Sequence, residues 1–249
     1  MDLSTIIAKR PTKTVYKDGN SVIKMMDESH SASDVLNEAL NLSIVYETGF
    51  KVPNLIEVVK HEGKWAIVTE YVEGQTIAEL IAEHPAKTDE YFSRFLDVQL
   101  EMHAYSAERL RHLTDKLQNE ISKSGLDAST RYELHIRLNG ITRHNKLCHG
   151  DFVPENVVIT PSGEACVLDW AHATQGNASA DAARTYLRFM LAGKDAYAEK
   201  YIELFCKKSD TARQYVQKWM SVVAVSQLAK ETPEERELLM KWVNVAEYQ

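Results

Sequence analysis

The sequence predicts an α+β protein of two lobes, a small β-rich lobe with one helix followed by a larger helical lobe. Strand-like runs separated by tight turns fill most of the first 72 residues, whereas from about residue 76 the apolar residues recur at helical spacing. Gly74 lies at this change of pattern. We therefore expect lobes at residues 1–72 and 73–249, with a hinge at about 70–74.

The predicted small lobe consists of two hairpins and a helix. Asp18-Gly19-Asn20 separates the β-rich runs TVYK and SVIKMM, which is a good hairpin signal. Apolar residues then follow helical spacing from Ser33 to about Thr48, where Ser31 or Ser33 can cap the helix and Gly49 can end it. The stretch KVPNLIEVVKHEGKWAIVTEYV predicts two further strands, which meet at the turn Glu62-Gly63-Lys64.

The larger lobe is predicted to be mostly helical, with one short hairpin. The strands of this hairpin are expected at 157–160 and 165–168, on either side of the turn Pro161-Ser162-Gly163-Glu164. Helices are expected to fill the chain after the hairpin. Before it, they are expected at residues 76–83, 88–104, about 107–122 and 128–139.

Composition and charge argue against several classes of function. Hydrophobic residues make up 44% of the chain and charged residues 26%, as in soluble globular proteins, and the net charge of −7 argues against a nucleic-acid partner. No apolar run approaches the roughly 18 residues of a membrane span, and the start lacks a secretory pattern. The three cysteines form no CxxC pair, so we expect a cytoplasmic protein, and the sequence leaves its oligomeric state open.

The loop in KLCHGDFVPENVVI, residues 146–159, carries polar residues that a simple turn does not need. Asp151 is followed five residues later by Asn156, and the predicted hairpin returns Asp169 toward this loop. An amide oxygen and a carboxylate are hard ligands suited to Mg²⁺ that carries phosphates, and Asp151 could accept a proton from a hydroxyl. This set suits phosphoryl transfer. The alternative is that Asp151 and Asn156 only hydrogen-bond their own backbone as turn residues.

The segments HGDFVPEN and VLDW resemble the catalytic and metal-binding segments of the aminoglycoside phosphotransferase and choline kinase family. GNASADAART is similar to the segment that follows them in small bacterial members of that family. The resemblance extends in order from about residue 5 to residue 191. It implies a bilobal protein-kinase-like fold, in which the small lobe binds the nucleotide and the large lobe carries catalysis and the substrate site.

The resemblance also implies roles for residues of the small lobe. Lys24, in SVIKMM, matches the lysine that contacts the α- and β-phosphates, and Glu38 matches its ion-pair partner. Glu47 is an alternative partner but lies too near the end of the predicted helix. In IVTEYVEG, Thr69 would be the gatekeeper, and the backbone of two hinge residues would meet the adenine. Those two residues are Glu70 and Val72.

In the larger lobe, the resemblance makes Asp151 the catalytic base and Asn156 and Asp169 the ligands of Mg²⁺. His149 and Asp181 would support this loop structurally. The nucleotide would be ATP, with GTP not excluded, and the acceptor would be the hydroxyl of a small molecule. Aminoglycosides, choline-like amines, amino alcohols and sugars all remain open, and the first of these would connect the protein with antibiotic resistance.

Two departures from the family pattern support a rival interpretation, a catalytically silent nucleotide-binding regulatory module. AKRPTKTV stands where a glycine-rich loop is expected, so backbone amides of residues 9–14 would have to hold phosphate, and Val153 stands where protein kinases carry a lysine. A protein kinase is a further rival. Only twelve positions separate Asp169 from Asp181, which leaves no room for an activation loop.

An acidic run lies near the end of the chain and consists of Glu231, Glu234, Glu235 and Glu237. Such a run could attract a cationic acceptor. The alternative, which we favour, is a solvated helix start that the helix dipole stabilises.

Overall fold

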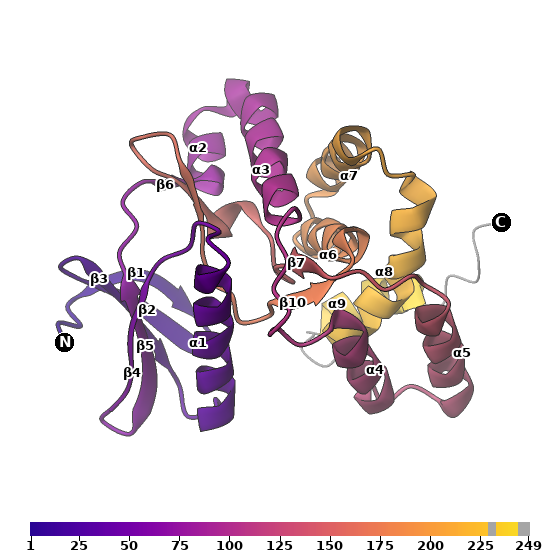
Figure 1. Cartoon of the computed structure of the whole chain (residues 1–249), viewed down its shortest axis with the longest axis horizontal. Coiled ribbons are helices and arrows are strands. Elements are labelled where there is room, and N and C mark those ends of the chain that lie inside the picture. The colour runs from indigo at the N-terminus through magenta and orange to yellow at the C-terminus, as the bar shows by residue number, and fades with distance from the viewer. Residues whose placement is uncertain (229–232, 244–249) are drawn as a thin grey trace. The chain divides into compact units, whose positions relative to one another are not determined.

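The fold was analysed in a computed structural model that describes residues 1–228 and 233–243 (Figure 1). The chain divides into two compact units, which we call unit 1 and unit 2. Unit 1 consists of Met1–Thr88 and Pro154–His172, and unit 2 consists of Asp89–Val153 and the described residues from Ala173 onward. The predicted α+β fold class, with a sheet and one helix followed by a helical part, is confirmed. The functional boundary at residues 72 and 73 stays a prediction.

Unit 1 is built on a five-stranded antiparallel sheet in the order β1-β2-β3-β5-β4 (Figure 1). Both predicted hairpins are present in it. The single long helix of the unit begins after Ser31, whose side chain forms a capping box with Asp34. These elements are β1 (Thr5–Arg10), β2 (Lys13–Asp18), β3 (Ser21–Met26), α1 (Ala32–Glu47), β4 (Leu55–His61) and β5 (Lys64–Glu70).

The two faces of this sheet bury different apolar clusters. α1 packs on one face, where Val35 and Ala39 meet Met26 and Ile67. The other face buries Ile23, Met25, Ala66 and Val68. This division fixes the direction of Lys24, because directly paired residues of an antiparallel sheet point to the same side and Lys24 pairs with Ile67. Lys24 therefore points to the side of the sheet that α1 covers.

A second, three-stranded sheet in unit 1 has the order β6-β8-β9. It joins β6 (Gln75–Thr76), just after the predicted hinge, to the predicted hairpin, which forms as β8 (Val157–Ile159) and β9 (Ala165–Val167). α2 (Ile77–Glu83) follows β6, with Thr76 as its capping residue, and the short helices η1 (Pro85–Lys87) and η2 (Pro154–Asn156) complete the unit.

Gly74, the residue before β6, lies very close to β8. It has a φ of +147°, and a Cβ atom there would lie 2.3 Å from the carbonyl oxygen of Ile159. We expect Gly74→Ala to lower the free energy of unfolding by about 2–4 kcal/mol, because the backbone of β8 must move. Gly63→Ala is the matched control, since Gly63 also has positive φ but has open space around it, and should cost only about 1 kcal/mol. Equal losses in urea titrations of the two variants would refute this explanation.

Unit 2 is mainly helical. Its helices are α3 (Thr88–Met102), α4 (Leu113–Lys123), α5 (Ala128–Asn139), α6 (Ala178–Leu191), α7 (Asp195–Ser209), α8 (Arg213–Leu228) and α9 (Pro233–Val243). Two short strands, β7 (Lys146–Cys148) and β10 (Thr174–Gly176), pair with each other. Large aromatic side chains such as Trp219, Tyr201 and Phe205 are almost fully buried in this unit.

The prediction of a helix from about residue 107 was wrong at its start, because α4 begins only at Leu113. The preceding residues run beside β10 instead. The backbone N–H of Gln175 donates to the carbonyl of Arg111, and its side chain donates to the carbonyls of Glu108 and Leu110. These bonds to a buried glutamine hold residues 108–111 in a non-helical conformation.

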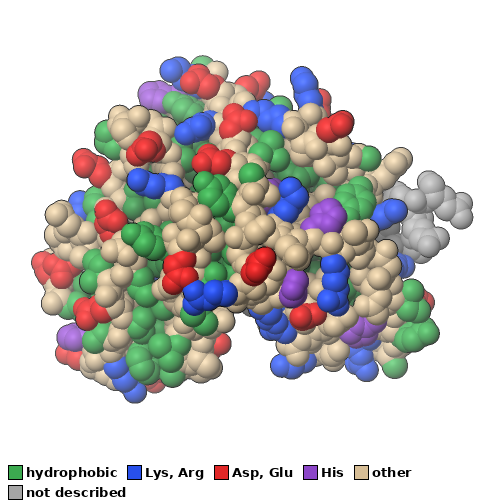
Figure 2. All heavy atoms as spheres, viewed as in Figure 1, with side chains coloured by type: hydrophobic (Ala, Val, Ile, Leu, Met, Phe, Trp, Pro, Cys, Tyr) green, Lys and Arg blue, Asp and Glu red, His purple; other side chains and the backbone are tan. Residues whose placement is uncertain are grey.

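Charged side chains of both signs are interspersed on the face of the molecule shown in Figure 2. Within residues 1–228 and 233–243, no helix is long and apolar enough to cross a membrane. Glu231, the first residue of the acidic run, lies outside the described residues.

Candidate active site

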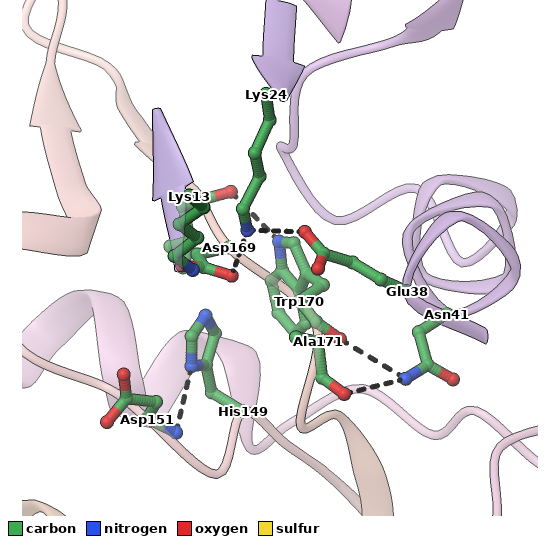
Figure 3. A network of polar contacts seen from close by, with 10 residues as sticks. Lys13, Lys24, Glu38, Asn41, His149, Asp151, Asp169, Trp170 and Ala171 are labelled. Carbon is green, nitrogen blue, oxygen red and sulfur yellow. Dashed lines mark hydrogen bonds and ion pairs between the residues drawn. The ribbon is translucent and has the colours of Figure 1, made fainter. Parts of the chain in front are cut away.

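Unit 1 brings together four charged side chains that are far apart in the sequence (Figure 3). Lys24 Nζ donates to Glu38 Oε1 at 2.5 Å and to Asp169 Oδ1 at 2.7 Å. Lys13 Nζ donates to the other oxygen of the same carboxylate, Asp169 Oδ2, at 2.9 Å. We call these four residues the ion-pair cluster. The structure thus brings the predicted pair of Lys24 and Glu38 into contact, and it adds Asp169 and Lys13.

Lys13 was missed by the sequence reasoning, although strand periodicity could have found it. Lys13 and Val15 lie two residues apart in β2 and therefore share a face of the sheet. Val15 pairs directly with Lys24 in β3, so Lys13 points to the side of Lys24 as well. The sequence reasoning considered only the backbone amides of residues 9–14. The side chain of Lys13 is instead the group that reaches Asp169.

The ion-pair cluster contains both positive and negative side chains, and it is largely shielded from solvent. The side chains of Lys24 and Glu38 are only 13% and 14% exposed, and that of Asp169 is 25% exposed. Burial by itself would lower the pKa of Lys24, but the carboxylates of Asp169 and Glu38 outweigh it and raise that pKa. Burial would likewise raise the pKa of Asp169, but Lys24 and Lys13 outweigh it and lower that pKa. Asp169 is therefore an anion at neutral pH.

The backbone at Asp169 has an unusual conformation, and the residues after it are held by hydrogen bonds to α1. Asp169 has a φ of +63°, a left-handed conformation that few residues other than glycine adopt and that often marks a functional site. After it, the carbonyls of Trp170 and Ala171 accept from Asn41 Nδ2 of α1 at 3.2 and 3.4 Å (Figure 3). Trp170 itself is buried and donates from Nε1 to the carbonyl of Val167. Asn41 had no role in the sequence prediction.

Asn156 lies at the end of η2 and is held beside the segment that carries Asp169. The backbone N–H of Leu168 donates to the carbonyl of Asn156 at 2.8 Å, and Val157 pairs with Val167. The β8–β9 hairpin therefore returns the chain to Asn156 one residue before Asp169, as the sequence predicted.

The predicted hinge is held by backbone bonds within unit 1. The N–H of Glu70 donates to the carbonyl of Asn54, and the N–H of Tyr71 donates to the carbonyl of Asn20. Glu70 and Val72 also border a cavity of about 760 Å³, whose lining includes neither Lys24 nor Asp169. Thr69 pairs with Val22, two residues before Lys24, and so faces the same side as Lys24. The adenine contacts assigned to Glu70 and Val72 stay predictions.

Asp151 lies in unit 2, in the loop after β7. Its backbone N–H donates to His149 Nδ1 at 3.1 Å (Figure 3), and its Oδ1 lies 3.0 Å from Nε of Arg188 on α6. His149 is fully buried and packs against Phe152 with the ring centroids 5.9 Å apart. The buried ring of His149 thus packs inside the loop, and the supporting role assigned to it stays a prediction.

Asp181 fixes the same loop from α6. It is 2% exposed, and its Oδ1 accepts from the backbone N–H of Gly150 at 2.7 Å. Its Oδ2 lies 3.0 Å from His103 Nε2 and accepts from Gln99 Nε2 at 3.4 Å. Burial would raise the pKa of Asp181, but the bond to His103 leads a set of interactions that lower it.

Comparison with known proteins decides the family. The profile of the phosphotransferase enzyme family matches residues 13–217, which is most of the chain. The chain belongs to this family. A search among curated protein sequences finds no match.

Solved structures show the same fold at low sequence identity. A thermostable mutant of the aminoglycoside phosphotransferase APH(4)-Ia has a TM-score of 0.69 and 14% identity, with 96% of this chain and 92% of that chain covered. Choline kinase LicA from Streptococcus pneumoniae gives 0.63 and 14%, covering 99% and 94%. A choline/ethanolamine kinase family protein from Mesorhizobium loti gives 0.61 and 17%, covering 94% and 84%. The chain thus has the kinase-like fold of these enzymes.

The oxygen donors of this site fit Mg²⁺ that is bound together with phosphates. Within the described part of the chain, no group of three or more His, Cys, Asp or Glu side chains gathers to hold a metal alone. Asp169 offers an ionised carboxylate, and Asn156 offers an amide on the adjoining segment. Mg²⁺ is commonly held by one or two protein oxygens, with phosphates and water completing its shell, so this small donor set is sufficient.

Asp181 gives a prediction for the pH dependence of stability. Because its pKa in the folded protein lies below the unfolded value of about 3.9, it stabilises the fold above that pH. This contribution is lost as the pH falls below about 4. We expect wild type to exceed Asp181→Asn in free energy of unfolding at pH 7, and the difference to shrink toward pH 3. A difference that stays constant with pH in denaturant titrations would contradict this role.

Proposed function

We propose that the chain is an ATP-dependent kinase that transfers the γ-phosphoryl group to a hydroxyl of a small molecule. The observation that carries this proposal is the ion-pair cluster of unit 1, in which Lys24 joins Glu38 to Asp169. It gives the family's expected phosphate-binding lysine a fixed position next to an ionised carboxylate. Structures of APH(4)-Ia in ternary complex with AMP-PNP and hygromycin B support a nucleotide and a small-molecule acceptor.

On the nucleotide side, Lys24 would neutralise the α- and β-phosphates, with Glu38 holding its ammonium group in place. Asn156 and Asp169 would hold Mg²⁺, which would offset the negative charge that develops on the phosphates. Lys13 presently shares Asp169 with Lys24. A bound nucleotide would give both ammonium groups phosphate oxygens as further partners.

On the acceptor side, Asp151 would accept the proton of the attacking hydroxyl. A bond forms between the acceptor oxygen and the γ-phosphorus, and the bond from that phosphorus to the bridging oxygen of ADP breaks. ADP leaves, and the proton remains on Asp151 until solvent removes it. Catalysis of this type depends mainly on positioning and charge neutralisation, so the fixed loop around His149 and Asp181 is important.

The rival, a silent nucleotide-binding module, has one structural observation in its favour. The turn between β1 and β2 consists of Pro11 and Thr12 and lacks glycine, and Lys13 just after it occupies an oxygen of Asp169. Such a module would bind Mg·ATP without turnover.

The test is ADP release by the full chain with Mg·ATP and Mg·GTP, across aminoglycosides, choline-like amines, amino alcohols and sugars. Nucleotide binding is measured in parallel by calorimetry. Acceptor-dependent ADP release that Asp151→Ala abolishes is the expected result. Tight Mg·ATP binding without turnover on any acceptor would favour the silent module, and a failure to bind either nucleotide would reject both alternatives.

A further inference from the structure

Two arginines of α6 lie beside the proposed base, in a part of unit 2 that the proposed reaction does not use. Arg184 and Arg188 are four residues apart, so they share one face of the helix. Arg188 Nε lies 3.0 Å from Asp151 Oδ1, and the charge of Asp151 also acts on Arg184. An acceptor hydroxyl that binds beside Asp151 would therefore lie close to the positive charge of these arginines.

The carboxylates around Arg184 do not outweigh the effect of burial on its pKa. Burial lowers the pKa of Arg184. Asp151, Glu120 and Asp181 act in the opposite direction, but Arg188 adds its repulsion to the effect of burial, and the net pKa remains lowered. A further anion in this place would stabilise both guanidinium groups.

Arg184 also keeps a hydrogen-bond donor without an acceptor. Arg184 donates from Nη1 to Ser226 Oγ at 3.1 Å. The Nε atom of Arg184 is shielded from solvent, and among the described residues it meets no acceptor in hydrogen-bond geometry. A shielded donor of this kind is uncommon in folded proteins, and a bound anion is one of the groups that can satisfy it.

We propose that the acceptor carries a phosphate or carboxylate near its reactive hydroxyl, and that Arg188 and Arg184 bind this oxyanion. A guanidinium group matches both anions, because its donors form a planar fork. The Arg188 side chain is 36% exposed, so a ligand can reach it. A cationic acceptor such as an aminoglycoside or choline would instead be repelled by the two arginines. This inference rests on the proposed function, and it selects an anionic acceptor where the proposed function leaves the acceptor class open.

The test uses hydroxyl compounds in matched sets, with the full chain, Mg²⁺ and nucleotide. Glycerol 3-phosphate and ribose 5-phosphate are compared with glycerate and ribonate, with the neutral parents glycerol and ribose, and with the cations choline and kanamycin. Binding is measured by calorimetry beside AMP-PNP, and turnover is measured as ADP release from ATP. We expect an anionic compound to bind and react where its neutral parent does not. A response to the phosphates alone or to the acids alone identifies which oxyanion is recognised.

The arginine variants separate acceptor binding from nucleotide binding. Arg188→Gln should raise the Kd of the anionic acceptor by about 10- to 100-fold and leave the Kd of Mg·ATP unchanged. Because this variant also removes the ion pair of Asp151, Arg184→Lys is a second test, which keeps the charge but loses the fork and should raise the same Kd. Arg213→Gln is the matched control, since Arg213 pairs with Glu199 on another helix of the same unit.

The inference is overturned if the neutral or cationic compounds bind and react while none of the anionic ones binds. It is also overturned if Arg188→Gln weakens Mg·ATP and not the acceptor, since Arg188 would then serve the nucleotide. Loss of Mg·ATP binding in wild type would be a different failure, because it would reject the proposed function itself.

Discussion

Asp151→Ala is expected to lower kcat by about 10³-fold with any acceptor that supports turnover, while the Kd of Mg·ATP stays close to that of wild type. The carboxylate lies in unit 2, whereas the ion-pair cluster lies entirely in unit 1. Removing it takes away the acceptor of the hydroxyl proton and leaves the cluster intact. Single-turnover kinetics and calorimetry measure the two effects separately.

Loss of a carboxylate from unit 2 needs its own control. Asp97→Asn serves this purpose, because Asp97 is exposed and is bonded to Lys208 at 2.6 Å. Its kcat should equal that of wild type. If Asp151→Ala also retained wild-type kcat, the proton acceptor would have to be another group and the assignment of Asp151 would be wrong.

The second large effect is expected for Asp169→Asn, which should weaken the binding of Mg²⁺. The Mg²⁺ concentration at half-maximal turnover should rise at least about 10-fold, and kcat should fall by about 10²-fold or more. The carboxylate is both the proposed metal ligand and the shared partner of Lys24 and Lys13. We also expect the free energy of unfolding to fall by about 1–2 kcal/mol, because the two lysines lose their common anion.

Asparagine is chosen at position 169 because it tolerates the φ of +63° nearly as well as aspartate does, so the backbone is kept. Glu57→Gln, which removes an exposed carboxylate from β4 in the same unit, is the control. Titrations of turnover with MgCl₂ at fixed ATP measure the effect. An unchanged Mg²⁺ requirement in Asp169→Asn would show that Asp169 does not hold the metal.

The sequence predicted the α+β architecture because its signals were local. The turn at Asp18-Gly19-Asn20, the spacing of apolar residues in α1 and the turn before β9 each act over a few residues. The contact between Lys24 and Glu38 could also be expected, since their spacing and order resembled those of the family. Their roles, like those of Asn156 and Asp169, stay predictions until the variants are measured.

Other parts of the site depend on long-range packing, which the sequence did not reveal. Lys13 reaches Asp169 across 156 positions of the chain, and Asn41 reaches Trp170 across 129. Arg188 meets Asp151 because Asp181, seven residues earlier in the same helix, ties that helix to Gly150. None of these three side chains stands in a motif, so only the fold identifies them.

The central claim is that this chain moves the γ-phosphoryl group of ATP to a small-molecule hydroxyl with Asp151 as base. The most direct measurement follows the phosphorus by ³¹P NMR in wild type and in Asp151→Ala, with Mg·ATP and each acceptor of the panel. The account predicts a new phosphate monoester that grows in step with ADP in wild type, and none in the variant although it still binds ATP. Formation of ADP and inorganic phosphate alone, or of equal monoester in both proteins, would contradict it.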